Sequence, residues 1–398
     1  MSAHSQRLND PSRSIQDITE RIEPQLIALR RDIHAHPELA FEEERTAGVV
    51  ARELTRLGVP CQTGVGRTGV VGLIEGGRPG PVLAIRADMD ALPIEERTGL
   101  PFASTRPGLM HACGHDVHTV TLLGVAAVLK ELAPQLAGAV KLVFQPAEEI
   151  LGGAKEMIAA GVMEAPRVDM ALGFHNIPNM PCGRFAYVPG AAMAAADAFD
   201  LTVHGRSGHA AHPEFAIDPI VAAAHLVTQL QSFVSREVGA IQSAVVTVGA
   251  MHGGSVRNII PEEVELRGTV RTLDETVRSR AEAAIRRLCE GIEKGMRVRC
   301  ELNYTLGVPP LRCDKALTER AVASVRAQLG EVIDEVEPTM GSEDFALFAE
   351  RVPAFHLRIG SGQPGREDRL HNSDYQPDES AIGLGVQALA RAAFDILA

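Results

Sequence analysis

The chain contains no tryptophan and only three tyrosines among its 398 residues. Aromatic side chains are the platforms on which single-stranded nucleic acids stack, so their scarcity disfavours that class of partner. Positive charge is also in the minority, because 39 Lys and Arg stand against 51 Asp and Glu, for a formal net charge of −12. Nucleic acids and anionic membrane surfaces repel an acidic chain, and we expect neither as a partner.

Long apolar runs and paired cysteines are missing as well. No stretch approaches the roughly 18 to 20 uninterrupted apolar residues of a membrane span. The polar N-terminal stretch Met1 to Ser14 has no apolar segment of the length that a signal peptide needs. The six cysteines include no CxxC pair, which in a chain of this size argues against a disulfide framework. A reducing cytoplasmic location is therefore expected.

The composition that remains is typical of a folded chain with two domains. A single hydrophobic core stops growing at roughly 250 to 300 residues. From Val82 to Phe174 short strands and helices alternate, which predicts an α/β domain with a largely parallel mixed sheet. From Phe199 to Tyr304 the predicted order is βαββαβ, that of an α+β ferredoxin-like unit. We therefore predict a discontinuous catalytic domain, residues 1–194 and 306–398, and an inserted domain, residues 195–305.

Three shorter segments carry local predictions. Apolar residues from Ile18 to Ile33 recur every three or four positions, which predicts a helix that Pro24 kinks or restarts. Residues Ser342 to Glu350 are predicted to form a helix. The alanine-rich stretch Ala191 to Ala196 is expected to connect the two domains.

Chemically capable side chains gather where the predicted strands of the α/β domain end, the edge at which such sheets bind ligands. These side chains are Asp88, Cys113, His115, Glu148, Glu149 and His175. A thiolate, imidazoles and carboxylates together form the ligand set of a borderline-soft divalent metal ion. Metal-assisted hydrolysis needs one carboxylate on the metal and a second to accept a proton from water, and adjacent Glu148 and Glu149 can divide those tasks. The same acidic pair could instead be a solvated helix start.

Two other interpretations stay open. Cys113 could be the nucleophile of a cysteine hydrolase, with His115 or His175 as its base, although the two-residue spacing and the paired acids suit a metal better. Alternatively, the protein could bind metal without catalysis and act as a dimeric binding module. The presence of Glu148, which a binding module would not need, argues against that alternative.

Several motifs resemble those of the hippurate hydrolase and N-acyl-amino-acid amidohydrolase group, which is related to aminoacylases and carboxypeptidase G. The motifs are MHACGHD (110–116), FQPAEE (144–149), GFHN (173–176), GHAAHP (208–213) followed by IDP, NIIP (258–261), GTVR (268–271) and LHN (370–372). The resemblance extends from about Arg30 to the C-terminus. It implies hydrolysis of an N-acyl amino acid to a carboxylic acid and a free amino acid. N-acetyl-diaminopimelate-type deacetylation, auxin-conjugate hydrolysis and dipeptide cleavage stay open within the same chemistry.

The resemblance also implies metal ligands. By position they are Cys113, His115, Glu149, His175 and His371, with Cys113 able to bridge two ions. One or two divalent ions per subunit are expected. Thiolate favours zinc on softness grounds, and the family also works with manganese, cobalt or nickel. The wider superfamily has a His where this chain has Arg86 and an Asp where it has Cys113.

Roles for the other matching residues follow from the same resemblance. Glu148 matches the general base, and Asp88 matches a carboxylate that orients a metal-bound imidazole. His209 resembles a histidine that reaches an active site across a homodimer, formed through the inserted domain, and stabilises the oxyanion. Asn258 and Arg271 match positions that contact the carboxylate end of the substrate, a task suited to a planar guanidinium. Independently of the resemblance, His118, which flanks the loop of Cys113 and His115, is expected to support the ligands or to pack beside them rather than bind metal.

Overall fold

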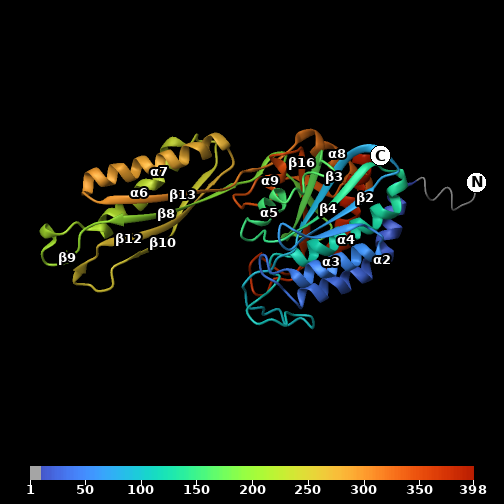
Figure 1. Cartoon of the computed structure of the whole chain (residues 1–398), viewed down its shortest axis with the longest axis horizontal. Coiled ribbons are helices and arrows are strands. Elements are labelled where there is room, and N and C mark those ends of the chain that lie inside the picture. The colour runs from blue at the N-terminus through green and yellow to red at the C-terminus, as the bar shows by residue number, and fades with distance from the viewer. Residues whose placement is uncertain (1–9) are drawn as a thin grey trace, which may run out of the picture. The chain divides into compact units, whose positions relative to one another are not determined.

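The computed structural model describes residues 10–398, which form two compact units (Figure 1). The first unit contains the described residues up to Gly190, with Arg312–Glu337 and Leu347–Ala398; the second contains Ala191–Leu311 and Pro338–Ala346. Residues 1–9, part of the stretch in which no signal peptide is expected, lie outside the described residues.

The second unit takes in more chain than the predicted range 195–305. Backbone hydrogen bonds explain the addition of Pro338–Ala346, because the amide of Thr339 donates to the carbonyl of Ala192 and that of Ala194 to Gly341, at 3.1 and 2.8 Å.

A mixed sheet is the centre of the first unit. Its strands lie in the order β1-β2-β4-β3-β5-β16-β6-β15. Their bounds are β1 Cys61–Val65, β2 Gly69–Glu75, β3 Arg78–Asp88, β4 Ala137–Gln145, β5 Met170–Pro181, β6 Phe185–Tyr187, β15 Ile333–Glu335 and β16 Ala354–Gly362. The central strands β4, β3, β5 and β16 pair in parallel, whereas β1, β2 and β4 pair antiparallel. The predicted α/β class with a largely parallel mixed sheet is confirmed.

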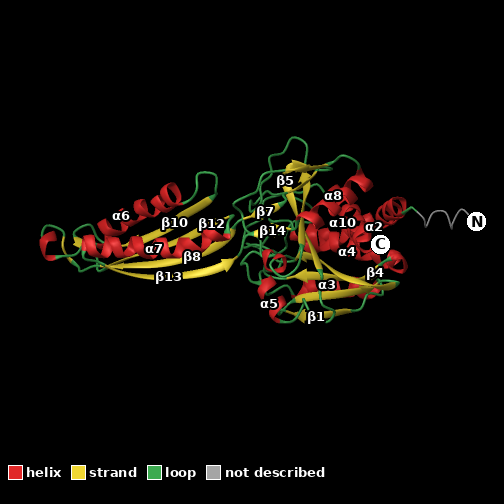
Figure 2. Ribbon diagram, turned by 90° about the horizontal axis from the view of Figure 1, so that it is seen from above, coloured by secondary structure: helices red, strands yellow, loops and turns green. Residues whose placement is uncertain are grey.

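Helices surround this sheet, and four of them, α2, α4, α8 and α10, pack against one another (Figure 2). The helices are α2 Pro11–His34, α3 Glu44–Arg56, α4 His115–Leu132, α5 Gly153–Ala159, α8 Lys315–Leu329, α9 Ala346–Ala349 and α10 Ser380–Leu397. Two helical windows, in α4 and α10, are long and apolar enough to cross a membrane by length and composition alone. However, 83% and 72% of these windows are buried inside the structure, which is typical of core helices.

The second unit has its own sheet and core. The chain order β8, α6, β10, β12, α7, β13 matches the predicted βαββαβ order, and the strands lie in the order β10-β12-β8-β13, all antiparallel. The bounds are β8 Ala195–His204, α6 Pro219–Ser232, β10 Ala244–Gly253, β12 Glu263–Thr272, α7 Glu275–Met296 and β13 Arg299–Val308. Two short strands, β9 Gly208–His209 and β11 Ile259–Ile260, form a separate pair. Apolar residues of the four-stranded sheet and of both helices form one core cluster.

Two local predictions need correction. Helix α2 continues through Pro24 without restarting, because its apolar face packs against α4 and α10 and this burial outweighs the lost backbone bond. The helix predicted over Ser342–Glu350 shrinks to α9, because the side chain of Glu343 accepts the amide of Phe345 at 3.1 Å and competes with helix formation.

The stretch Ala191 to Ala196, expected to connect the two domains, begins at the first residue of the second unit. This stretch is mostly strand, because β7 Gly190–Met193 pairs with β14 Leu311–Cys313 and β8 begins at Ala195. Strand pairing uses backbone groups, so it overrides the weak strand preference of alanine.

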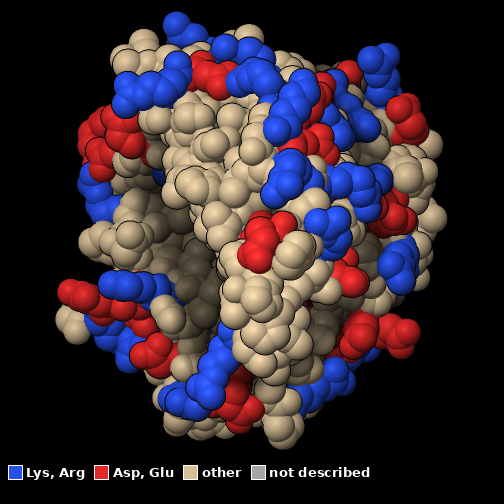
Figure 3. All heavy atoms as spheres, turned by 90° about the vertical axis from the view of Figure 1, so that its left-hand side faces the viewer, with Lys and Arg blue, Asp and Glu red and all other residues tan. Residues whose placement is uncertain are grey.

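Surface charges of both signs are mixed. On the face shown in Figure 3, Lys and Arg side chains alternate with Asp and Glu side chains. That pattern differs from the continuous basic field with which proteins neutralise nucleic-acid phosphates.

Candidate functional site

Three neighbouring parallel strands of the first unit bring the predicted residues to one edge of the sheet. Asp88 is the last residue of β3. Glu148 and Glu149 follow shortly after the end of β4, and His175 lies within β5. Strand β3 pairs with both β4 and β5, so these side chains meet although they are far apart in the chain.

Two loops complete the edge. Gly114 has a φ of 85°, a left-handed conformation that glycine adopts without strain, and it turns the chain between Cys113 and His115, the first residue of α4. The His371 amide donates a hydrogen bond to the carbonyl of Ala112 at 2.8 Å. That bond ties the loop before α10 to the loop that carries Cys113, and thereby brings His371 to the site.

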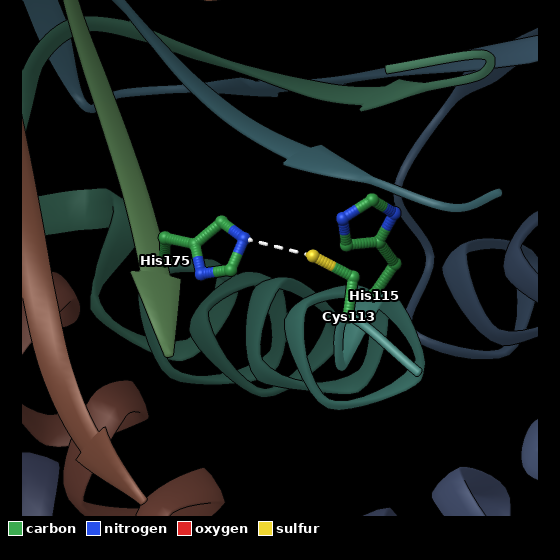
Figure 4. Close-up of side chains that lie close together, drawn as sticks. All are labelled: Cys113, His115 and His175. Carbon is green, nitrogen blue, oxygen red and sulfur yellow. Dashed lines mark hydrogen bonds between the residues drawn. The ribbon is translucent and has the colours of Figure 1, made fainter. Parts of the chain in front are cut away.

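Cys113 is the centre of the resulting cluster. Its sulfur belongs to two sets of three potential metal ligands, one with His115 and His175 and one with Glu149 and His371; within each set the ligand atoms lie within 4.8 Å of one another. The Sγ atom of Cys113 lies 3.4 Å from Nε2 of His175 (Figure 4). A single sulfur atom therefore stands where two ligand sets meet.

Hydrogen bonds orient both imidazoles of the first set. Nδ1 of His115 donates to Asp90, whose carbonyl oxygen lies at 2.9 Å and whose Oδ1 lies at 3.1 Å. Nδ1 of His175 donates to the carbonyl of Asn176 at 2.7 Å. With Nδ1 of each ring engaged, Nε2 is the nitrogen left to face the cluster, and Nε2 of His115 is buried without a hydrogen-bond partner among the described residues. Metal-binding histidines characteristically have this arrangement.

The two adjacent glutamates also reach the cluster. Oε2 of Glu149 lies 3.4 Å from Nε2 of His371, and Oε1 lies 3.9 Å from Nε2 of His115. Oε2 of Glu148 lies 4.0 Å from the same His115 nitrogen. Glu148 is buried and His371 is 51% exposed, so the site opens to solvent on the His371 side.

Protonation states follow from burial and neighbouring charge. Burial lowers the pKa of His175 well below its usual value, which keeps that imidazole neutral. Burial raises the pKa of Glu149, but the hydrogen bond from His371 and the charge of His115 outweigh it, and the net shift is downward. A neutral imidazole and an ionised carboxylate are the forms that bind metal.

The thiol behaves differently. Burial raises the pKa of Cys113 well above its usual value, although His115 acts in the opposite direction. A reactive cysteine needs a lowered pKa, so this environment disfavours the cysteine-nucleophile alternative. A bound cation would reverse the shift, because coordination deprotonates a thiol.

Asp88 contacts a different imidazole from the predicted ligands. Its Oδ1 lies 2.5 Å from Nδ1 of His118, and its Oδ2 accepts a hydrogen bond from Arg86 at 2.6 Å. Nε2 of His118 accepts the amide of Asn176 at 2.9 Å, so the proton of His118 is on Nδ1 and points at Asp88. Both nitrogens of His118 are thus occupied. The supporting role expected of His118 remains a prediction. The same holds for the role of Asp88 in orienting a metal-bound imidazole, and its Oδ2 lies 3.8 Å from Nε2 of His115.

Asp90 is the carboxylate that contacts a predicted ligand directly, and the sequence predictions missed it. Besides meeting Nδ1 of His115, it accepts the amide of Glu149 on Oδ2 at 3.0 Å. The available signal was the Asp88-Met89-Asp90 spacing just past a strand, which places two acids at one sheet edge.

The other predicted residues lie in the second unit. Nδ1 of His209 accepts the amide of Ala211 at 3.1 Å, so the neutral ring presents an Nε2–H donor, and the ring is exposed. The carbonyl of Asn258 accepts the amide of Ala210. Arg271 lies in β12 with its backbone paired to β8 and β10.

Comparisons with known proteins give one consistent result. The family model described as Peptidase family M20/M25/M40 matches residues 84–395. N-acetylcysteine deacetylase of Bacillus subtilis is 40% identical over 377 residues, which cover 94% of this chain and 97% of that protein. Hippurate hydrolase of Campylobacter jejuni is 38% identical over 372 residues, covering 93% and 96%.

A solved structure agrees. The YxeP protein of Bacillus subtilis, described as a dinuclear metal binding peptidase from the M20 family, is 36% identical to this chain with a TM-score of 0.84; the match covers 95% of this chain and 99% of that one. The resemblance predicted from the motifs is confirmed.

Proposed function

The chain belongs to peptidase family M20/M25/M40, whose curated relatives hydrolyse amide bonds, and from this premise we propose that it is a metal-dependent amidohydrolase of N-acyl amino acids. The observation that carries the proposal is Cys113, shared by two sets of ligand atoms. The products would be a carboxylic acid and a free amino acid.

The donor atoms suit a pair of divalent ions. His115 and His175 would hold one ion, Glu149 and His371 the other, and Cys113 both. The buried, unpartnered Nε2 of His115 supports this assignment, since a buried polar atom without a hydrogen-bond partner is otherwise unfavourable. The mixed S, N and O set favours zinc, with manganese, cobalt or nickel as alternatives. Such ions supply Lewis-acid polarisation of an amide carbonyl and acidify a water molecule.

Glu148 would act as the general base. Its carboxylate lies beside the ligand atoms and adjoins a ligand residue in sequence, a position from which it can take the proton of an attacking water and pass it to the departing amine. Asp88 would support the site through His118. His209 would stabilise the developing oxyanion with its Nε2–H, the tautomer that the Ala211 amide favours.

The substrate class rests on the relatives and on two polar residues. Hippurate and N-acetylcysteine, named for the relatives, are both N-acyl amino acids with a free carboxylate. Arg271 and Asn258 would bind that carboxylate, and Arg271 is half-buried on its strand. No contact of the described residues favours N-acetyl-diaminopimelate, an auxin conjugate or a dipeptide over this class.

A homodimer through the second unit is part of the proposal. Large apolar side chains are exposed on and near α6, β10 and β11, namely Ile220, Val221, Val245, Met251, Val256 and Ile259. Strand β10 is also an edge strand of its sheet, with free backbone groups for pairing. Apolar surface of this kind marks association sites.

Amine release from a panel of N-acyl amino acids tests the function. The purified protein is assayed as isolated, after chelation, and after re-addition of zinc, manganese, cobalt or nickel. We expect chelation to abolish turnover and metal to restore it. Absence of turnover in every metal state would favour the binding-module alternative, and turnover that survives complete metal removal would refute the proposed metal dependence.

A further inference from the structure

The turn that carries Glu148 is held in an unfavourable conformation. It connects β4 to α5, and two of its non-glycine residues, Ala147 and Leu151, have left-handed φ angles of 54° and 53°. Residues other than glycine rarely adopt this backbone conformation, and they keep it only when the surrounding structure enforces it. Something outside the turn must therefore fix the backbone next to the proposed base.

One restraint comes from a buried carboxylate at the start of α3. Glu43 is fully buried, and its Oε1 accepts the amide of Ala147 at 2.9 Å and that of Phe41 at 3.0 Å. Its other oxygen accepts the hydroxyl of Thr68. Glu43 and Ala147 are 104 residues apart in the chain, so this contact exists only in the folded state.

The second restraint is Asp90. It is buried too, and Oδ2 accepts the amide of Glu149 at 3.0 Å while Oδ1 faces Nδ1 of His115 at 3.1 Å. The residue before Glu148 is thus held by one carboxylate and the residue after it by another.

We propose that Glu43 and Asp90 are positioning residues that clamp the two backbone amides on either side of Glu148 and so aim its carboxylate at the reacting water. Fixing both neighbouring amides restrains the backbone on either side of Glu148, from which its side chain extends. Asp90 additionally couples the base to the metal site, because the same carboxylate orients His115. This inference rests on the proposed function, in which Glu148 is the base.

The two residues predict different failures. Removal of the Glu43 side chain releases the backbone next to the base. Among the described residues that side chain makes no hydrogen bond to a proposed ligand side chain, so kcat should fall while KM and metal content stay unchanged. A misplacement of about 1 Å in a catalytic group can reduce the rate roughly 100-fold. Loss of the Asp90 carboxylate releases the amide of Glu149 and removes one of the two acceptors of His115 Nδ1, so metal affinity should fall by about 10- to 100-fold as well.

Glu38 provides a matched control. It precedes the same helix, is buried, and accepts three hydrogen bonds, from the amides of Arg45 and Thr46 and from the hydroxyl of Thr46. No hydrogen bond of its side chain reaches the turn of Glu148. Glu38→Ala should therefore lower the Tm through the same helix start without lowering kcat per folded, metal-loaded enzyme.

The experiment measures kcat, KM, Tm and bound metal for wild type, Glu43→Ala, Glu43→Gln, Glu43→Asp, Asp90→Asn and Glu38→Ala. We expect kcat to fall about 10- to 100-fold in Glu43→Ala, at unchanged metal content. Glu43→Gln, which keeps an oxygen for both amides, should restore most of it. Glu43→Asp retains the charge but is one methylene shorter, so its kcat should fall as in Glu43→Ala. This variant also provides the test if the alanine variant does not fold.

The clamp is refuted if Glu43→Ala and Glu43→Asp keep the wild-type kcat and lose only Tm, or if Glu38→Ala lowers kcat equally. For Asp90→Asn, one oxygen cannot serve both donors, so an unchanged metal affinity measured by calorimetry would remove Asp90 from the clamp. Wild type is measured first, because a wild type without amide hydrolysis in any metal state overturns the proposed function itself.

Discussion

Replacement of Glu148 by Gln separates proton transfer from metal binding. Glutamine has nearly the same shape as glutamate, so the turn and the neighbouring ligands should stay in place. The amide cannot accept a proton from water. General-base catalysis contributes about 10²- to 10⁴-fold, which at 1.36 kcal/mol per tenfold amounts to about 3 to 5 kcal/mol of activation free energy. We expect kcat to fall by that factor.

Glu149→Gln is the matched control, one residue along the same turn. Oε2 of Glu149 lies 3.4 Å from Nε2 of His371, within one of the two ligand sets. This substitution should therefore lower metal content, whereas Glu148→Gln should leave it unchanged. Both variants are assayed by amine release and by metal analysis of the same samples.

Two results would contradict this reasoning. A Glu148→Gln variant with the wild-type kcat would show that another group takes the proton. A Glu148→Gln variant that loses its metal would make Glu148 a ligand rather than a base. The pH dependence of kcat/KM supplies an independent check, because its acidic limb should disappear together with the base.

The remaining predictions concern ligands, specificity and stability. Cys113→Ala removes a member of both ligand sets and should abolish binding of two ions, whereas His175→Ala should reduce stoichiometry to one; metal analysis that shows equal losses would contradict the shared thiolate. Arg271→Ala should raise KM for carboxylate-bearing substrates but not for their amides, and equal KM changes for both would exclude the proposed contact. Arg30→Ala breaks a buried ion pair, in which Nε lies 2.7 Å from Oδ2 of Asp116, and should destabilise the fold by about 3 to 5 kcal/mol in denaturant melts. Burial raises the pKa of Asp116, but Arg30 and His34 outweigh it and hold the pKa far below its usual value, so its contribution to stability is present above about pH 4 and is lost as pH falls below that. Asp116→Asn should accordingly flatten the acid limb of the stability curve, and an unchanged limb would contradict this assignment.

The sequence contained enough to predict the fold class and the chemistry. Alternating short strands and helices predicted the α/β sheet, and the βαββαβ order of the second unit followed from the same periodicities. The short motifs around Cys113 and Glu148 predicted the ligand types, because residues two or one positions apart in a turn must share one location whatever the rest of the chain does. Local spacing determines such neighbours directly.

Local propensity failed where packing or pairing between distant segments decided the outcome. Pro24 did not restart α2, because the helix is buried against α4 and α10. The alanine-rich stretch near Ala192, for which only a connecting role was predicted, is also strand through pairing with β14. Both outcomes depend on partners that the local sequence does not contain.

The sequence by itself determined which residue types are available to the site, namely one thiol, several imidazoles and the paired acids. The tertiary structure alone decided how they are oriented. Asp90 rather than Asp88 holds His115, the His371 loop is tied to Ala112, and Glu43 reaches Ala147 across 104 residues. These hydrogen bonds join segments whose proximity arises only from strand order and helix packing, so spacing along the chain could place Asp90 at the sheet edge but could not reveal which groups these residues contact.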